Sequence, residues 1–210
     1  MQKFRAPIYT LIFDIGNVII DIDYDQLMQG FKKIAKEDFR NKISATNQES
    51  IFDRFEKGMA DADEFRNALR PFLKESTSDA EIDTAWNSLI IGFPEEKFLL
   101  LETLRKQYRI LALSNINAIH LAYIDAQVQQ RFGQRSLRHF FDKVYYSFEV
   151  GARKPEAAIY QRVLNEESVP AEEMLFIDDL EKNTAAAAAM GIQTYTLEHR
   201  GNLKDLFPLF

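Results

Sequence analysis

Residues 8–14 read Ile8-Tyr9-Thr10-Leu11-Ile12-Phe13-Asp14, a short apolar run that stops at an acid. A bounded, continuously apolar run of this length is typical of a strand buried on both faces, as in a parallel sheet. Three more runs of this kind follow, each ending in polar residues: 110–113 before Ser114-Asn115, 144–146 before Ser147, and 174–177 before Asp178-Asp179. The sequence therefore predicts four buried strands.

Helical patterns separate the later runs. Residues 95–107 repeat apolar side chains at helical spacing, and the alanine-rich stretch 181–190 ends at Gly191, a suitable helix end. Residues 155–165 begin with Pro155, which we expect in the first helical turn. Strands that alternate with helices indicate an α/β fold with a Rossmann-like, mostly parallel sheet.

Residues 21–94 interrupt this alternation. Helical patterns cover residues 25–35, 47–57, 63–72 and 79–90, and Gly92-Phe93-Pro94 then punctuates the chain. We expect a helical cap domain over residues 21–94, inserted after the first strand between two parts of a catalytic core, residues 1–20 and 95–210. Trp86, Leu89 and Ile90 are expected to face the core of the inserted domain.

Composition limits the function classes. The 210 residues carry 26 Lys+Arg against 32 Asp+Glu, a net charge of −6, which argues against a protein that coats nucleic acid. Cysteine is absent, which excludes a thiolate nucleophile and a Cys-ligated metal. No targeting segment is visible, and no apolar run approaches the roughly 18 residues of a membrane span. We therefore expect a cytoplasmic protein with neither a membrane nor a nucleic acid as its partner.

Polar residues follow each predicted strand, and in open parallel sheets ligands bind beyond these carboxyl ends. Residues distant in sequence should therefore meet there: Asp14, Ser114-Asn115, Ser147 and Asp178-Asp179, with Lys154 within reach. Three carboxylates in one crevice need a positive charge between them, and Mg²⁺ prefers carboxylates, water and phosphate oxygens. A hydroxyl, backbone N–H groups and an ammonium suit phosphate. Asp14 could then serve as the nucleophile of a phosphoryl transfer.

These segments resemble the four motifs of the haloacid dehalogenase (HAD) superfamily, in the family's order. They are Phe13-Asp14-Ile15-Gly16-Asn17-Val18-Ile19-Ile20-Asp21, Leu113-Ser114-Asn115, Gly151-Ala152-Arg153-Lys154-Pro155, and Phe176-Ile177-Asp178-Asp179 with downstream Asn183 and Gly191. The insertion lies where the family's C1-type helical cap sits. Residues 55–58, Phe55-Glu56-Lys57-Gly58, are similar to a cap loop of the branch that includes bacterial glucose-1-phosphate phosphatases.

The resemblance implies a role for each matching residue. Asp14 would be the nucleophile and a Mg²⁺ ligand, joined by the backbone carbonyl of Gly16 and by Asp179, with Asp178 as a direct or water-mediated helper. Ser114 and the backbone of Asn115 would hold the phosphate, and Lys154 would neutralise nucleophile and phosphate. Glu56 and Lys57 would contact the substrate from the cap. The implied function is a Mg²⁺-dependent phosphomonoesterase for a small phosphorylated metabolite, such as a sugar phosphate.

One position departs from the family pattern. HAD phosphatases usually carry a second Asp two residues after the nucleophile as general acid and base, and this chain has Gly16 there. Such a loss costs on the order of 10²–10⁴ in rate, and Asp21 or Asp23 are nearby in sequence. A catalytically weak or degenerate HAD-fold binding protein is the main alternative. A dehalogenase is disfavoured by the Asp178-Asp179 pair, and a phosphoreceiver domain by the position of that pair and by the insertion.

Overall fold

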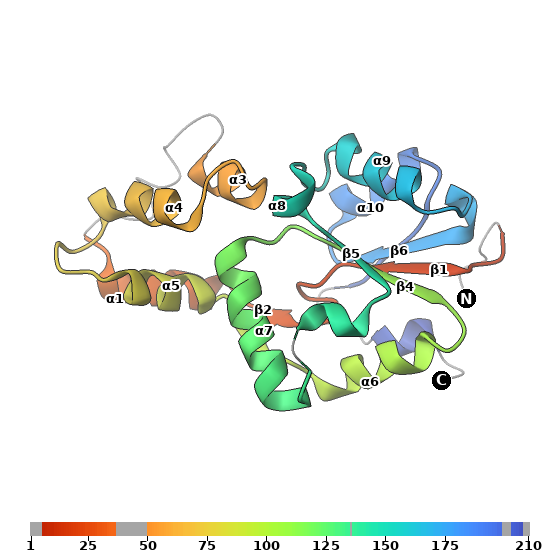
Figure 1. Ribbon diagram of the computed structural model, residues 1–210, viewed down its shortest axis with the longest axis horizontal. Coiled ribbons are helices and arrows are strands. Elements are labelled where there is room, and N and C mark those ends of the chain that lie inside the picture. The colour runs from red at the N-terminus through yellow and green to blue at the C-terminus, as the bar shows by residue number, and fades with distance from the viewer. Residues whose placement is uncertain (1–5, 37–49, 135, 199–202, 208–210) are drawn as a thin grey trace.

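A computed structural model describes residues 6–36, 50–134, 136–198 and 203–207 (Figure 1). Its main sheet has the strand order β5-β4-β1-β6-β7 and is parallel throughout. The strands are β1 (Thr10–Phe13), β4 (Arg109–Ser114), β5 (Lys143–Tyr146), β6 (Met174–Asp178) and β7 (Gln193–Thr196). The α/β fold and the four predicted strands are confirmed, because each apolar run forms a strand of this sheet over most of its length.

Helices cover both faces of the sheet (Figure 1). On one face, α6 (Glu95–Leu104) and α7 (Ala118–Phe132) pack in an apolar cluster with β1. On the other, α9 (Ala157–Glu166) and α10 (Glu181–Ala189) pack around Phe176 and Leu111. This burial from both sides explains why the strand sequences are continuously apolar.

Among the described residues between β1 and α6 there are four further helices, which are called the inserted helices here. They are α1 (Tyr24–Ile34), α3 (Ile51–Glu56), α4 (Ala62–Leu69) and α5 (Asp79–Asn87), with the 3₁₀ turn η1 (Arg70–Phe72) after α4. They share their own apolar cluster, in which the rings of Phe55 and Phe65 stack with centroids 4.4 Å apart and Trp86 lies 4.8 Å from Phe65. In Figure 1 they form a separate body beside α7 and α8 (Ser147–Val150).

Two short strands connect the inserted helices to the sheet domain. Here β2 (Asp21–Ile22) pairs antiparallel with β3 (Ile90–Gly92). The expected orientation of Ile90 was therefore wrong: α5 ends at Asn87, and Ile90 lies in β3 and packs in the cluster of the sheet domain. Trp86 does pack among the inserted helices, as predicted.

Local signals account for several helix ends. Ser78 and Glu81 form a reciprocal capping box at the start of α5, so two of its free backbone N–H groups are satisfied. The expectation for Pro155 was wrong, because α9 begins at Ala157 and the cis peptide bond Lys154–Pro155 precedes it. Among the described helices the longest, α7, has 15 residues, and none is long and apolar enough to cross a bilayer. The predicted helix start at residues 47–49 lies outside the described residues.

Candidate active site

Three carboxylates meet at the carboxyl ends of two neighbouring strands. Asp14 directly follows β1, Asp178 is the last residue of β6, and Asp179 comes next. The register pairs Phe13 with Ile177, which puts Asp14 and Asp178 side by side. One carboxylate oxygen from each acid lies within 4.8 Å of the others. Because these are hard oxygen donors gathered on one side of a sheet, the set suits a small divalent cation.

A buried lysine joins two of these acids. Nζ of Lys154 lies 2.8 Å from Oδ1 of Asp14 and 2.7 Å from Oδ2 of Asp178, with 1% of its side chain exposed. Burial lowers the pKa of Lys154, but the two carboxylates outweigh burial and raise it. The ammonium therefore stays charged, and it is held in place by Asn115, whose side chain exchanges two hydrogen bonds with the Lys154 backbone at 2.9 and 2.8 Å.

The site retains an excess of negative charge. The pKa of Asp14 is raised to about 7, because burial and the Asp178 charge raise it by more than Lys154 lowers it. Oδ1 of Asp14 also accepts a hydrogen bond from the N–H of Ile15 at 2.6 Å, which favours the anion. Burial and Asp178 thus disfavour the Asp14 anion on balance, and a further cation at this place would favour it.

The two adjacent acids of β6 have different surroundings. The Asp178 carboxylate is fully buried and accepts hydrogen bonds from the Leu180 N–H, the Asn183 amide and Lys154. Asp179 is half-buried, and Nδ2 of Asn17 donates to its Oδ2 at 2.9 Å. Sequence reasoning gave Asn17 no role, although an Asn beside a Gly was a signal: it adopts a left-handed backbone with φ of 57°.

The end of β4 and the residue after it bring Ser114 and Asn115 to the same edge, as predicted. The expectation for Ser147 was wrong. Its hydroxyl is fully buried and bonds both the N–H and the carbonyl of Ile116, each at 3.0 Å. Ser147 therefore fixes the loop that follows Ser114 and does not face a ligand.

A cavity of about 110 Å³ adjoins these residues, between the sheet edge and the inserted helices. Gly16, Ser114 and Asn115 line it from the sheet domain, and Tyr24, Glu56 and Trp86 line it from the inserted helices. Most of the remaining wall is aliphatic: Ile15, Ile20, Ile22, Leu27, Leu89, Ile90, Ile116 and Ile124. Burial raises the pKa of Glu56 to about 7, against the lowering effect of Lys154 and Lys182.

Ion pairs tie α3 to the loop that carries Lys154. Nζ of Lys57 lies 2.6 Å from Oε1 of Glu156, and a guanidinium nitrogen of Arg153 lies 3.1 Å from Oε2 of Glu56. Arg153 also pairs with Asp53. Sequence reasoning quoted Arg153 within a motif but missed this contact, since its partners lie about 100 residues away.

Asp21 and Asp23 do not line this cavity. Oδ1 of Asp21 pairs with Nζ of Lys97 at 3.0 Å, and Asp23 caps the start of α1 by accepting from the backbone of residues 25 and 26. Neither acid is placed to act on a group bound beside Gly16.

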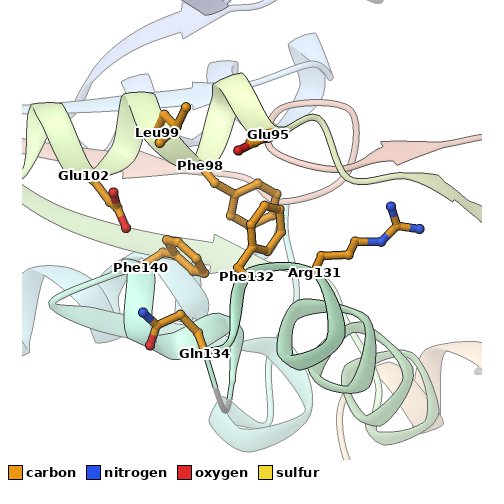
Figure 2. A pocket seen from close by; sticks show the side chains of 8 residues that line it. All are labelled: Glu95, Phe98, Leu99, Glu102, Arg131, Phe132, Gln134 and Phe140. Carbon is orange, nitrogen blue, oxygen red and sulfur yellow. The ribbon is translucent and has the colours of Figure 1, made fainter.

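A larger hollow, of about 300 Å³, lies elsewhere (Figure 2). It opens between α6, the end of α7 and the 3₁₀ turn η2 (Leu137–Phe140) over the rings of Phe98, Phe132 and Phe140. The Phe98 and Phe132 centroids are 4.4 Å apart, and polar side chains such as Glu102 and Arg131 stand at the rim. None of its lining residues belongs to the strand ends that carry the clustered carboxylates, whereas the smaller cavity is lined by Gly16, Ser114 and Asn115 from the same edge of the sheet as those carboxylates, so the smaller cavity is the better candidate site.

The chain is similar over nearly its whole length to a phosphatase and to solved structures of a HAD family enzyme. It is 30% identical over 192 residues to D-ribitol-5-phosphate phosphatase from Bacteroides thetaiotaomicron, covering 91% of this chain and 93% of that protein. The crystal structure of HAD family enzyme bt-2542 from the same organism matches with a TM-score of 0.90 at 33% identity, covering 96% of this chain and 99% of that one. Its wild-type complex with magnesium and inorganic phosphate matches with a TM-score of 0.86 at 35% identity, covering 95% and 99%.

The family assignment rests on an independent match as well. Residues 8–191 match the family model of haloacid dehalogenase-like hydrolases. The matched residues run from just before β1 to just after α10. All four segments quoted above fall within that match. The chain belongs to the haloacid dehalogenase-like hydrolase family.

Proposed function

We propose that this protein is a Mg²⁺-dependent phosphomonoesterase that acts on a small phosphorylated metabolite, such as a sugar phosphate, through an aspartyl-phosphate on Asp14. The observation that carries the proposal is the placement of Asp14 against Lys154 and two further carboxylates, next to a cavity that Gly16, Ser114 and Asn115 line. The relative named as a D-ribitol-5-phosphate phosphatase and the structure solved with magnesium and phosphate support it.

Four residues would hold the cation: Asp14, the backbone carbonyl of Gly16, Asp179, and Asp178 as a helper. The buried hydrogen bonds of Asp178 favour Asp179 as the more available carboxylate. When bound, Mg²⁺ neutralises the acids and polarises the phosphoryl oxygens.

The chain's own groups would do the remaining work. The Ser114 hydroxyl and the Asn115 N–H would donate to phosphate oxygens, and Lys154 would offset the charge that develops in the transition state. An Asp14 oxygen would attack phosphorus as the ester oxygen leaves, and water would then cleave the acyl phosphate and restore Asp14.

The inserted helices would serve as the cap, with residues 21–94 as cap and residues 1–20 and 95–210 as core. Glu56 lines the cavity and is the stronger candidate for substrate contact. Lys57 is already paired with Glu156, which favours a role in holding the cap on the core. A lid of this kind excludes water and selects small substrates.

A phosphate-binding protein without turnover is the second candidate, and Gly16 is the observation that favours it. The two are separated by phosphate release from a panel of sugar phosphates and p-nitrophenyl phosphate with Mg²⁺. Turnover that disappears in Asp14→Asn and with EDTA supports the phosphatase. Release no faster than that of Asp14→Asn on every substrate would exclude the phosphatase and favour binding alone.

A further inference from the structure

We propose that Glu56, from the inserted helices, supplies the general acid and base that the chain lacks at Gly16. The proposal rests on the phosphatase function and assigns its missing proton donor.

The place beside Gly16 is crowded by an aliphatic side chain. The three atoms nearest to a Cβ built at position 16 all belong to Ile22, with Cδ1 at 3.0 Å. An aspartate at this position would therefore need Ile22 to shift. Asp21 and Asp23 are engaged with Lys97 and with the start of α1, so neither neighbour in sequence replaces it.

Glu56 is the only acid among the described residues that line the cavity next to Gly16 and Ser114. It is the last residue of α3, and 23% of its side chain is exposed. Oε2 is buried without a hydrogen-bond partner, although the Arg153 guanidinium lies 3.1 Å away. Oε2 thus faces Arg153, and because Glu56 lines the cavity, its carboxyl group can contact a hydroxyl or water bound there.

The surrounding charges permit both protonation states near neutral pH. Arg153 faces Glu56 from the Lys154 loop, Lys154 and Lys182 act on it from the sheet domain, and the Tyr24 hydroxyl is close enough to feel its charge. Asp53, on the same helix, shares Arg153 with Glu56. Burial outweighs the cations and raises the pKa of Glu56 to about 7, where an acid and base works best.

The proton balance closes over two steps. In the first, Asp14 attacks phosphorus, the P–O bond to the alcohol breaks, and the protonated Glu56 carboxyl gives its proton to the leaving oxygen. In the second, the Glu56 carboxylate takes a proton from water, the resulting hydroxide attacks phosphorus, and the bond to Asp14 breaks. Phosphate leaves, and Asp14 and protonated Glu56 are regenerated.

The test compares two leaving groups in Glu56→Gln, with Asp53→Asn as the matched control that removes the other partner of Arg153. A sugar alcohol needs a proton to leave, so its turnover should fall on the order of 10²–10⁴-fold in Glu56→Gln. p-Nitrophenolate needs none, so its first turnover should stay near wild type and appear as a burst. Slow hydrolysis should follow, with phosphoenzyme accumulating. Asp53→Asn should resemble the wild type in both assays.

If Glu56 had a merely structural role, Glu56→Gln would turn over both substrates more slowly to the same extent and without a burst. This result would overturn the proposal. Sugar-phosphate turnover in Glu56→Gln within about threefold of wild type would also overturn the proposal, because the loss of a general acid should lower turnover far more. If Glu56→Gln does not fold, Glu56→Ala with added formate takes its place, and formate should restore the lost turnover. Failure of the underlying function is recognised separately, because wild type and Asp14→Asn would then release phosphate equally, and both proposals would be wrong.

Discussion

Gly58 lies where the inserted helices touch the sheet domain, and one added methyl group there tests how closely the two must pack. It follows α3 with φ of +67° and completes a helix-ending motif, in which its N–H donates to the Phe55 carbonyl and the Met59 N–H to that of Arg54. A Cβ at Gly58 would lie 2.1 Å from the carbonyl oxygen of Phe148 in α8. Gly58→Ala therefore forces the two bodies apart.

The size of the effect follows from that distance. Ordinary contact begins at 3.4 Å, so the carbonyl must retreat by 3.4 − 2.1 = 1.3 Å. A misplacement of about 1 Å can cost on the order of 10²-fold in rate, and Glu56 lies two residues away from the point of contact. The left-handed backbone adds about 1–2 kcal/mol to the cost of any alanine there.

Gly133 provides the matched control. Its φ is +69°, and a Cβ there meets nothing within 4 Å. Gly133→Ala should lose the same 1–2 kcal/mol of unfolding free energy in urea denaturation and keep its kcat/KM for sugar phosphates. Gly58→Ala should lose about 10²-fold in kcat/KM beyond that control. Equal kcat/KM in the two variants would refute the account of the contact.

Three further outcomes are expected. Lys154→Met should lower the unfolding free energy in urea by about 3–5 kcal/mol, since it leaves two buried carboxylates without their cation, and a loss below about 1 kcal/mol would contradict this. Burial lowers the pKa of His120 to about 3 from 6.5, so the folded state binds fewer protons and stability falls as pH drops below 6.5. The His120 contribution to this loss is about 2 kcal/mol between pH 7 and pH 5, so over that range His120→Gln should retain about 2 kcal/mol more of its unfolding free energy than the wild type does, and equal changes in the two proteins would contradict this. In titration calorimetry, Asp179→Asn should weaken Mg²⁺ binding at least about tenfold, whereas Asp21→Asn, which pairs with Lys97, should bind as the wild type does; equal affinities would contradict the ligand assignment.

The strands that are buried on both faces could be predicted from the sequence, whereas the more exposed strands could not. The runs that became β1, β4, β5 and β6 are apolar because helices cover both sides of them. The edge strand β7, Gln193-Thr194-Tyr195-Thr196, is half-buried and mostly polar, and β2 has two residues, so neither carries a strand pattern. Ile90 continues a helical pattern in the sequence, but in the structure it begins β3 and pairs with Ile22 of β2.

Topology explains what could be predicted of the candidate site. Parallel strands bring their carboxyl ends to one edge, so Asp14, Asp178 and Lys154 could be placed together from their positions alone. Long-range side-chain packing could not be read in this way. The Ser147 hydroxyl is buried and bonds the Ile116 backbone, and Arg153 forms ion pairs with acids of α3.

The central claim is that Asp14 becomes phosphorylated during turnover. The direct measurement is rapid acid quenching of the enzyme with p-nitrophenyl phosphate and Mg²⁺, followed by mass spectrometry of the peptide that spans residues 6–32. The account predicts one added phosphoryl group on Asp14 in the wild type, more of it in Glu56→Gln, and none in Asp14→Asn. Phosphate release by the wild type with no phosphoryl group on that peptide in either the wild type or Glu56→Gln would contradict it.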